Sequence, residues 1–170
     1  MYSGKILNLR TDTVLLPSGK TSLREVVEHR PAVCILAENH KGEVLFVRQH
    51  RYPVGRAVLE LPAGVVEPGE DPLETAHREL REEVGLDARQ MTEITRFYTS
   101  PGFCDEEIIL YFASDLFEAP LEGDEDETIR VETWSRKALA EALENREIRD
   151  GKTLIALYWY LLQTQEPLRS

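Results

Sequence analysis

The sequence predicts an α/β protein, a layered α/β/α sandwich with a mixed sheet, preceded by an added β-hairpin. Short apolar runs bounded by turn residues fill the first part of the chain and are typical of strands. Helical patterns join them from the middle of the chain onward, which favours a sheet covered by helices. With 170 residues, 42% hydrophobic and 30% charged, the chain is long enough to bury one sizeable core.

The first part of the chain reads as strands joined by turns. A Pro-Ser-Gly-Lys turn at residues 17–20 separates the first two strands, and a turn at 39–42 separates the next two. The predicted strands cover residues 5–16, 21–28, 32–38, 44–49 and 58–61.

An amphipathic helix follows, with clear signals at both ends. Asp71 is a good N-cap, Pro72 fits the first helical position, and Glu74 completes a capping box. Gly85 is placed to end the helix in a left-handed conformation. A core-facing apolar stripe is expected at Leu73, Ala76, Leu80 and Val84.

Strands and helices alternate in the second half. Ser135 is placed to cap a helix that runs to about residue 145, and a last helix is expected at 153–163. A very acidic loop occupies residues 118–128. The predicted strands cover residues 91–100, 107–113 and 131–134.

Three glutamates of the central helix, Glu79, Glu82 and Glu83, indicate its chemistry. Their spacing of i, i+3 and i+4 brings them together on the helix, where like charges repel unless a cation lies among them. Carboxylate oxygens without histidine or cysteine suit hard divalent ions such as Mg²⁺ or Mn²⁺. We expect Arg78 to pair with Glu82, four residues later.

The net charge of −11 argues against general nucleic-acid binding, which needs a basic surface. It suits a phosphate substrate only if divalent metals at the glutamates reverse the local charge. The apolar stretches are too short to span a bilayer, and the start of the sequence has no signal-peptide pattern. Two cysteines are too few for a disulfide framework. We therefore expect a cytoplasmic protein without a membrane partner.

The stretch from Gly64 to Leu86 reads G-x5-E-x7-R-E-U-x-E-E-x-G-U, where U is aliphatic. It resembles the Nudix box at every specified position. The chain is therefore similar to the Nudix hydrolases, which cleave nucleoside diphosphates linked to another moiety and have a layered α/β/α fold. The resemblance implies a Nudix domain at residues 31–170, with the box at 64–86, and an N-terminal β extension at residues 1–30.

Segments outside the box resemble the ADP-ribose pyrophosphatase branch. They include VRQHRYPVG, ELPAGVVEPGED and REIRDGKT, and Pro101 follows Gly85 by sixteen residues. The implied reaction converts ADP-ribose and water to AMP and ribose 5-phosphate. GDP-mannose and other nucleoside-diphosphate-sugar hydrolases share much of this framework and remain an alternative. A non-catalytic nucleotide-binding module of the same fold is disfavoured by the intact box.

The resemblance implies a metal centre of two or three Mg²⁺ or Mn²⁺ ions. Glu79 and Glu83 match the principal ligands of the family, and the backbone carbonyl of Ala63 matches a third. Glu82 is either a ligand or a residue that orients the site. In the acidic loop, Glu127 matches a further ligand.

Four residues of the box are expected to act structurally: Gly64, Glu70, Arg78 and Gly85. A side chain at Gly64 would crowd the Ala63 carbonyl and the phosphate. Glu70 is expected either to pair with Arg78, holding the loop against the helix, or to contact a ligand.

The acidic loop matches a segment that closes over the pyrophosphate in this branch. Aligning residues 129–131 with the branch places Glu125 at the position of the general base. Without the resemblance, the same run reads equally well as a solvated acidic loop. Glu82 is the next candidate for the base.

The substrate contacts also follow from the resemblance. Arg51 matches an arginine that binds the diphosphate. Ser100, Gly102 and Glu106 match a loop near the terminal ribose of the nucleoside diphosphate sugar.

Relatives exchange the N-terminal hairpin between two subunits to build a shared site. We therefore expect a homodimer with exchanged N-terminal arms, in which Glu25 or Arg24 reaches the adenosine end of the substrate. The four histidines share no metal-ligand spacing, and His77 is expected to face solvent.

Overall fold

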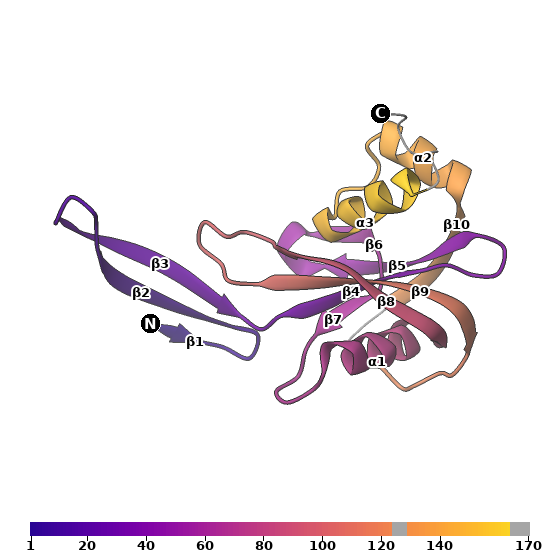
Figure 1. The fold of residues 1–170 in the computed structure, drawn as a ribbon, viewed down its shortest axis with the longest axis horizontal. Coiled ribbons are helices and arrows are strands. Elements are labelled where there is room, and N and C mark those ends of the chain that lie inside the picture. Colours follow the sequence, from indigo (N-terminus) through magenta and orange to yellow (C-terminus); the bar gives the residue numbers. More distant parts are fainter. Residues whose placement is uncertain (124–128, 164–170) are drawn as a thin grey trace.

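The computed structural model describes residues 1–123 and 129–163 as a layered body with a projecting arm (Figure 1). Helix α1 (Pro72–Val84) lies on one side of the strands, and α2 (Arg136–Glu144) and α3 (Gly151–Leu162) lie on the other. This arrangement agrees with the predicted α/β/α sandwich.

Two sheets form the middle of the body. Strands β4 and β9 are parallel and their other neighbours are antiparallel, so the four-stranded sheet is mixed, as predicted. Its order is β7 (Ala63–Val65), β4 (Ala32–Ala37), β9 (Glu107–Glu118) and β8 (Leu86–Tyr98). The three-stranded antiparallel sheet has the order β10 (Ile129–Ser135), β5 (Glu43–Arg51) and β6 (Arg56–Glu60).

Strand β4 joins the two hydrophobic clusters of the body. All six of its residues are buried, and successive side chains point to opposite faces of a sheet. Residues 32, 34 and 36 pack in one cluster with side chains of α2 and α3. Residues 33, 35 and 37 pack in the other cluster with Ala76 and Leu80 of α1. Helices on both faces of the sheet account for this continuous apolar run.

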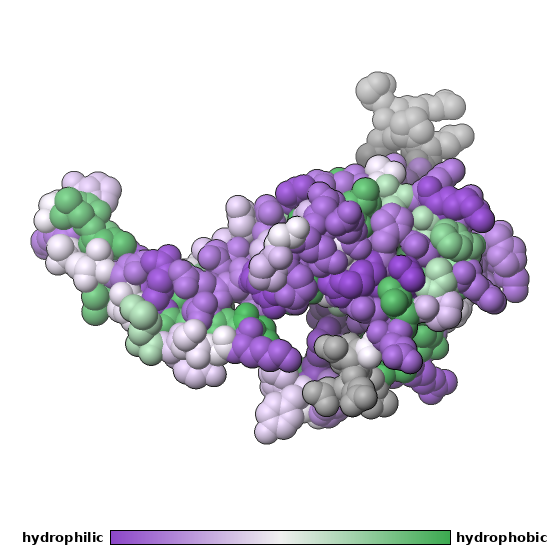
Figure 2. All heavy atoms as spheres, turned by 90° about the horizontal axis from the view of Figure 1, so that it is seen from below, coloured by the Kyte–Doolittle hydropathy of each residue, from purple (hydrophilic) through white to green (hydrophobic). Residues whose placement is uncertain are grey.

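The N-terminal residues form a separate antiparallel sheet that projects from the body (Figures 1 and 2). Its base is joined to the body by hydrogen bonds from Val27 N to the Phe103 carbonyl (2.7 Å) and from Asp105 N to the Val27 carbonyl (3.2 Å). Its strands are β1 (Tyr2–Ser3), β2 (Leu7–Leu15) and β3 (Thr21–His29). Exposed hydrophobic side chains on this arm include those of Tyr2, Ile6, Leu9, Leu15 and Leu23.

Helix α1 begins and ends where the sequence predicts. Asp71 caps it by accepting a hydrogen bond from Leu73 N at 2.8 Å, and Gly85 adopts a left-handed φ of 78°. Leu73 does not join the core, because it lies in the first turn and remains 39% exposed. The expectation that His77 faces solvent is also incomplete, since its ring contacts the carboxylate of Asp87.

Several boundaries differ from the predicted ones. Strand β8 begins at Leu86 instead of residue 91, because its first residues pair with the end of β9. Helix α3 begins at Gly151, since Asp150 accepts from Thr153 N at 2.9 Å and caps it. Short β1, short β7 and the 3-10 helix η1 (Tyr52–Val54) were not predicted. Within the described residues, no helix has the length and apolar character needed to cross a membrane.

Candidate active site

A cavity of about 800 Å³ lies beside α1 and is lined by both acidic and basic side chains. The groups come from the base of the arm, from β5, from α1 and from the first turn of α3. The acidic residues are Glu67, Glu79, Glu82, Glu83 and Glu106, and the basic ones are Lys5, His29, Arg30, Arg51, Arg78 and Lys152.

Helix α1 brings its three glutamates to this cavity. Leu80 and Ala76 are fully buried against the strands and fix the rotation of the helix. Glu79 and Glu83, one turn apart, are each only 9% exposed. Buried carboxylates are uncommon unless they are paired or bind a cation. The helix therefore holds charged oxygens at the cavity wall.

Arg78 binds the carboxylates around it. Its guanidinium donates to Glu70 (2.9 and 3.1 Å), to Glu79 (2.6 Å) and to Glu82 (2.9 Å). The predicted contacts with Glu70 and Glu82 are therefore present. Hydrogen bonds from Arg78 lower the pKa of Glu70 to about 2, and the same bonds raise the pKa of Arg78. Glu70 consequently fastens the loop before α1 to the helix.

Gly64 allows Glu79 to approach strand β7. A Cβ placed at Gly64 would lie 2.0 Å from the carboxyl carbon of Glu79. This contact is an additional reason for glycine at position 64, and the expected conflict with the Ala63 carbonyl and the phosphate stays a prediction. Glu83 is held by the same strand, since it accepts a hydrogen bond from Ala63 N at 3.0 Å.

A second network lies on the basic side of the cavity. Arg51 donates to Glu60 at 2.8 and 2.9 Å, Lys152 also contacts Glu60, and Lys152 lies 3.0 Å from Asp150. Burial alone would raise the pKa of Glu60, but the bonds and charges of Arg51 and Lys152 lower it. Burial alone would lower the pKa of Lys152, but Asp150 and Glu60 raise it.

The sequence did not indicate Lys152, Glu60, Lys5 or Arg30 as site residues. Lys152 follows Asp150 in the segment RDGKT, so an N-cap followed by a lysine in the first helical turn was the available signal. Glu60 carries no such signal, because its partner Lys152 is 92 positions away.

The predicted ribose loop is only partly at the cavity. Glu106 lines it, where it accepts from the Thr99 hydroxyl at 2.8 Å and lies 3.4 Å from His29 Nδ1. Ser100 and Gly102 are outside the lining. The Ser100 carbonyl instead accepts from Phe103 N and Cys104 N and closes a turn.

The two arm residues are not brought to the cavity within one chain. Arg24 and Glu25 lie on β3, opposite residues 11 and 12 of β2. Arg24 donates to the Ser22 hydroxyl and the Leu23 carbonyl, both at 2.8 Å, on the exposed arm.

The described donors match the chemistry of a hard divalent ion. Glu79, Glu82, Glu83 and Ala63 all line one cavity, and carboxylate and carbonyl oxygens are the donors that Mg²⁺ and Mn²⁺ prefer. In the described part of the chain, no three His, Cys, Asp or Glu side chains are gathered as a metal cage. Arg78 and Ala63 N donate hydrogen bonds to oxygens of these carboxylates, and a bound metal would share those oxygens with them. Glu125 and Glu127 lie outside the described residues.

Comparison with known proteins identifies the family. The model of the NUDIX domain matches residues 28–157. The chain belongs to the Nudix family. The Nudix box at residues 64–86 therefore runs from strand β7 through the following loop and helix α1 to the start of β8. It supplies every acidic residue of the cavity lining except Glu106.

Two curated relatives are similar over nearly the whole length of this Nudix protein. ADP-ribose pyrophosphatase of Bacillus subtilis is 42% identical, covering 100% of this chain and 92% of its own. Methanol dehydrogenase activator of Bacillus methanolicus is 40% identical, covering 99% of this chain and 91% of its own. A crystal structure of an ADP compounds hydrolase shares the fold, with a TM-score of 0.86 at 23% identity over 98% of this chain and 92% of its own.

Proposed function

We propose that this Nudix protein hydrolyses the pyrophosphate bond of ADP-ribose and related ADP-sugars, giving AMP and ribose 5-phosphate. The observation that carries the proposal is one cavity in which Glu79, Glu82 and Glu83 lie together with Arg51 and Lys152. Carboxylates suit the cations that a pyrophosphate requires, and the basic groups suit its oxygens. The 42% identical relative is an ADP-ribose pyrophosphatase, which supports the choice of substrate.

In this proposal Glu79, Glu83 and the Ala63 carbonyl would hold two or three Mg²⁺ or Mn²⁺ ions. When bound, the metal supplies Lewis-acid polarisation of the phosphate oxygens. Arg78 keeps Glu79 and Glu82 on the cavity side of α1. Arg51 orients the diphosphate and is itself kept in place by its two bonds to Glu60.

In the proposed reaction, Glu125 accepts the proton of the water that attacks one phosphorus, and Glu127 adds a ligand from the same acidic loop. Glu125→Gln is expected to lower kcat roughly 100-fold or more, because general bases typically contribute that much. Mn²⁺ binding, followed by electron paramagnetic resonance, should stay close to that of the unchanged chain. An unaltered kcat would transfer the role of base to Glu82, and Glu82→Gln is the variant to compare.

We propose that a partner subunit binds the nucleoside end of the substrate. Residues 1–30 form the proposed exchanged arm of a cytoplasmic homodimer, with Arg24 or Glu25 reaching the adenosine of the other subunit. The exposed hydrophobic side chains of the arm and its projection from the body support this (Figure 2). The proposal also keeps Ser100, Gly102 and Glu106 as the loop near the terminal ribose. A fully active monomer in sedimentation analysis would contradict the exchange.

The test of the proposed function is a panel of nucleoside diphosphate derivatives with Mg²⁺ and product identification. ADP-ribose should be cleaved to AMP and ribose 5-phosphate. The panel is needed because a second relative, 40% identical, has another name, methanol dehydrogenase activator. Cleavage of GDP-mannose without cleavage of ADP-ribose would favour the nucleoside-diphosphate-sugar alternative. Absence of turnover across the panel would favour a binding module. Reaction in ¹⁸O-labelled water then identifies the phosphorus that is attacked.

A further inference from the structure

We propose that a second pocket, separate from the active-site cavity, binds a phosphate monoester. It has a volume of about 230 Å³ and shares no lining residue with the larger cavity. Arg48, which lines it, and Arg51, which lines the larger cavity, are three positions apart on β5. Side chains three positions apart on a strand leave opposite faces of the sheet. The two sites therefore lie on different sides of β5.

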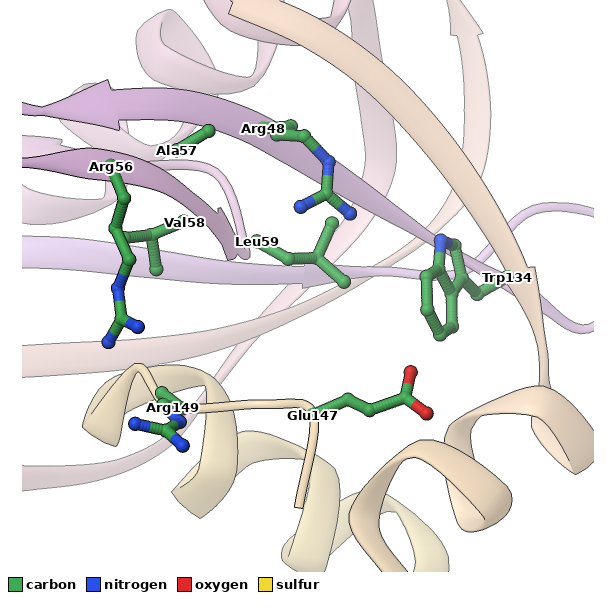
Figure 3. Close-up of a pocket in the computed structure, with 8 residues that line it drawn as sticks. All are labelled: Arg48, Arg56, Ala57, Val58, Leu59, Trp134, Glu147 and Arg149. Atoms are coloured by element: carbon green, nitrogen blue, oxygen red, sulfur yellow. The ribbon is translucent and has the colours of Figure 1, made fainter. Parts of the chain in front are cut away.

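The pocket has a basic end and an aromatic end (Figure 3). Arg56, at the start of β6, and Arg149, in the loop before α3, lie at one end, and Trp134 of β10 lies at the other. Leu59 lies between them, and its side chain is almost wholly buried. The walls therefore come from three separate segments of the chain that the fold brings together.

Arg56 and Arg149 contribute positive charge that the neighbouring side chains leave unneutralised. Among the described residues, no carboxylate lies within ion-pair distance of either guanidinium. Arg48 differs, since it donates to Glu132 at 2.7 and 3.3 Å. Glu147 also lines the pocket, with its carboxylate toward the Trp134 end (Figure 3), and it accepts from the Asn145 side chain at 3.3 Å. A local excess of positive charge is unexpected in a protein with a net charge of −11.

These features select the class of ligand. Guanidinium groups bind phosphate through paired, charge-assisted hydrogen bonds, and two of them suit a dianionic phosphate monoester. The flat indole of Trp134 offers a stacking surface for a sugar or a base. The pocket is smaller than most ligand cavities, which measure about 300–1,000 Å³. A sugar phosphate or a mononucleotide is therefore the size of ligand that fits.

The test is calorimetric titration in excess EDTA, which keeps the metal-dependent reaction out of the measurement. The probes are inorganic phosphate, ribose 5-phosphate, AMP and, as the molecule without phosphate, adenosine. The test variant carries Arg56→Gln and Arg149→Gln. The matched control carries Lys20→Gln and Lys41→Gln, which remove the same charge from two exposed turns. A third variant, Arg51→Gln, alters only the active-site cavity.

We expect AMP or ribose 5-phosphate to bind the unchanged chain, the lysine control and the Arg51→Gln variant with similar affinity. The double arginine variant should bind roughly tenfold more weakly or worse, because two charge-assisted bonds are lost. Tighter binding of AMP than of ribose 5-phosphate would assign the Trp134 end to the base, and the reverse would assign it to the sugar. Adenosine should not bind.

Equal affinity of the double arginine variant and the lysine control would overturn the proposal. So would a loss of binding that follows Arg51→Gln alone, because the ligand would then belong to the active site. Far-UV circular dichroism and thermal unfolding check that each variant is folded. The titration measures binding and no turnover. Its result therefore does not depend on whether the proposed reaction takes place, and the two proposals can fail independently.

Discussion

Arg78 donates to three carboxylates, so a single guanidinium sets the positions of Glu70, Glu79 and Glu82. A lysine carries the same charge but has no planar fork and cannot make these contacts together. Arg78→Lys is therefore expected to lower kcat/KM at least about tenfold and to lower the free energy of unfolding by about 1–3 kcal/mol. Steady-state kinetics and urea unfolding measure the two effects.

Arg89→Lys is the control for this substitution. Arg89 and Asp115 form an exposed ion pair, with side chains 61% and 55% exposed, and exposed pairs contribute little to stability. Both activity and unfolding should be nearly unchanged. If Arg78→Lys behaved like Arg89→Lys, the glutamates would not depend on the Arg78 fork.

Gly64 tests the approach of Glu79 to strand β7. In Gly64→Ala the added Cβ would lie 2.0 Å from the Glu79 carboxyl carbon, so the carboxylate must move. We expect Mn²⁺ affinity and kcat each to fall roughly tenfold or more. Gly151→Ala is the matched control, because a Cβ there meets nothing within 4 Å. Similar Mn²⁺ affinity in both variants would show that Glu79 has room to relocate.

At the scale of elements, caps were easier to predict than strand pairing. The ends of α1 are set locally. Asp71 accepts a hydrogen bond from Leu73 N, two positions away, and Gly85 adopts a left-handed conformation. The first residues of β8 alternate in polarity only over the short stretch from Leu86 to Arg89, and their strand pairing is supplied by β9. Lys152 was missed for a related reason, since its contact with Glu60 arises from tertiary packing over 92 positions.

Helix α3 is tied to the end of β4 by a hydrogen bond from the Tyr160 hydroxyl to the Glu38 carboxylate. Burial and this bond raise the pKa of Tyr160 to about 12. A raised pKa means that the folded state retains the proton longer than the unfolded state. The contribution of the Tyr160 hydroxyl to stability is therefore fully present below about pH 10, the ordinary pKa of tyrosine. It is lost as the pH rises towards 12.

Tyr160→Phe tests this linkage. At pH 8 the variant should be less stable by about 1–3 kcal/mol, because Glu38 loses its donor. Between pH 9 and 11 the difference from the unchanged chain should shrink by about 1 kcal/mol. Urea unfolding at several pH values measures it. A difference that stays constant over this range would mean that Tyr160 titrates normally in the folded state.

At the scale of the whole molecule, the net charge of −11 and the acidic wall of the cavity predict that divalent ions stabilise the protein and support the proposed activity. EDTA should abolish turnover while leaving a folded protein. Added Mg²⁺ should raise Tm in proportion to its binding, since a ligand of the native state stabilises it. In a variant with Glu79→Gln and Glu83→Gln, Mg²⁺ should raise Tm no more than NaCl of equal ionic strength. Full activity in EDTA would contradict the metal assignment.

The body of the molecule and its acidic wall could be predicted because the Nudix box is contiguous in the sequence. On the basic side of the cavity only Arg51 was expected, from the resemblance. Lys5, Arg30 and Lys152 were not, because these residues come from separate segments of the chain. Their convergence depends on how the arm, β5 and α3 are placed around the sheets. Single residues of this kind carry no local pattern that distinguishes them from surface charges.

The parallel pairing of β4 with β9 has a consequence for how the chain reaches its native state. Ala32 pairs with Ile108, a separation of 76 positions. Both clusters of the core contain residues of β9, so neither can be completed before this late strand is available. Contacts between distant residues slow folding, since the loop between them must close first. During synthesis, the fully apolar β4 lacks its parallel partner until β9 has emerged. Early strands of this kind are the segments that chaperones shield and that aggregate in destabilised variants.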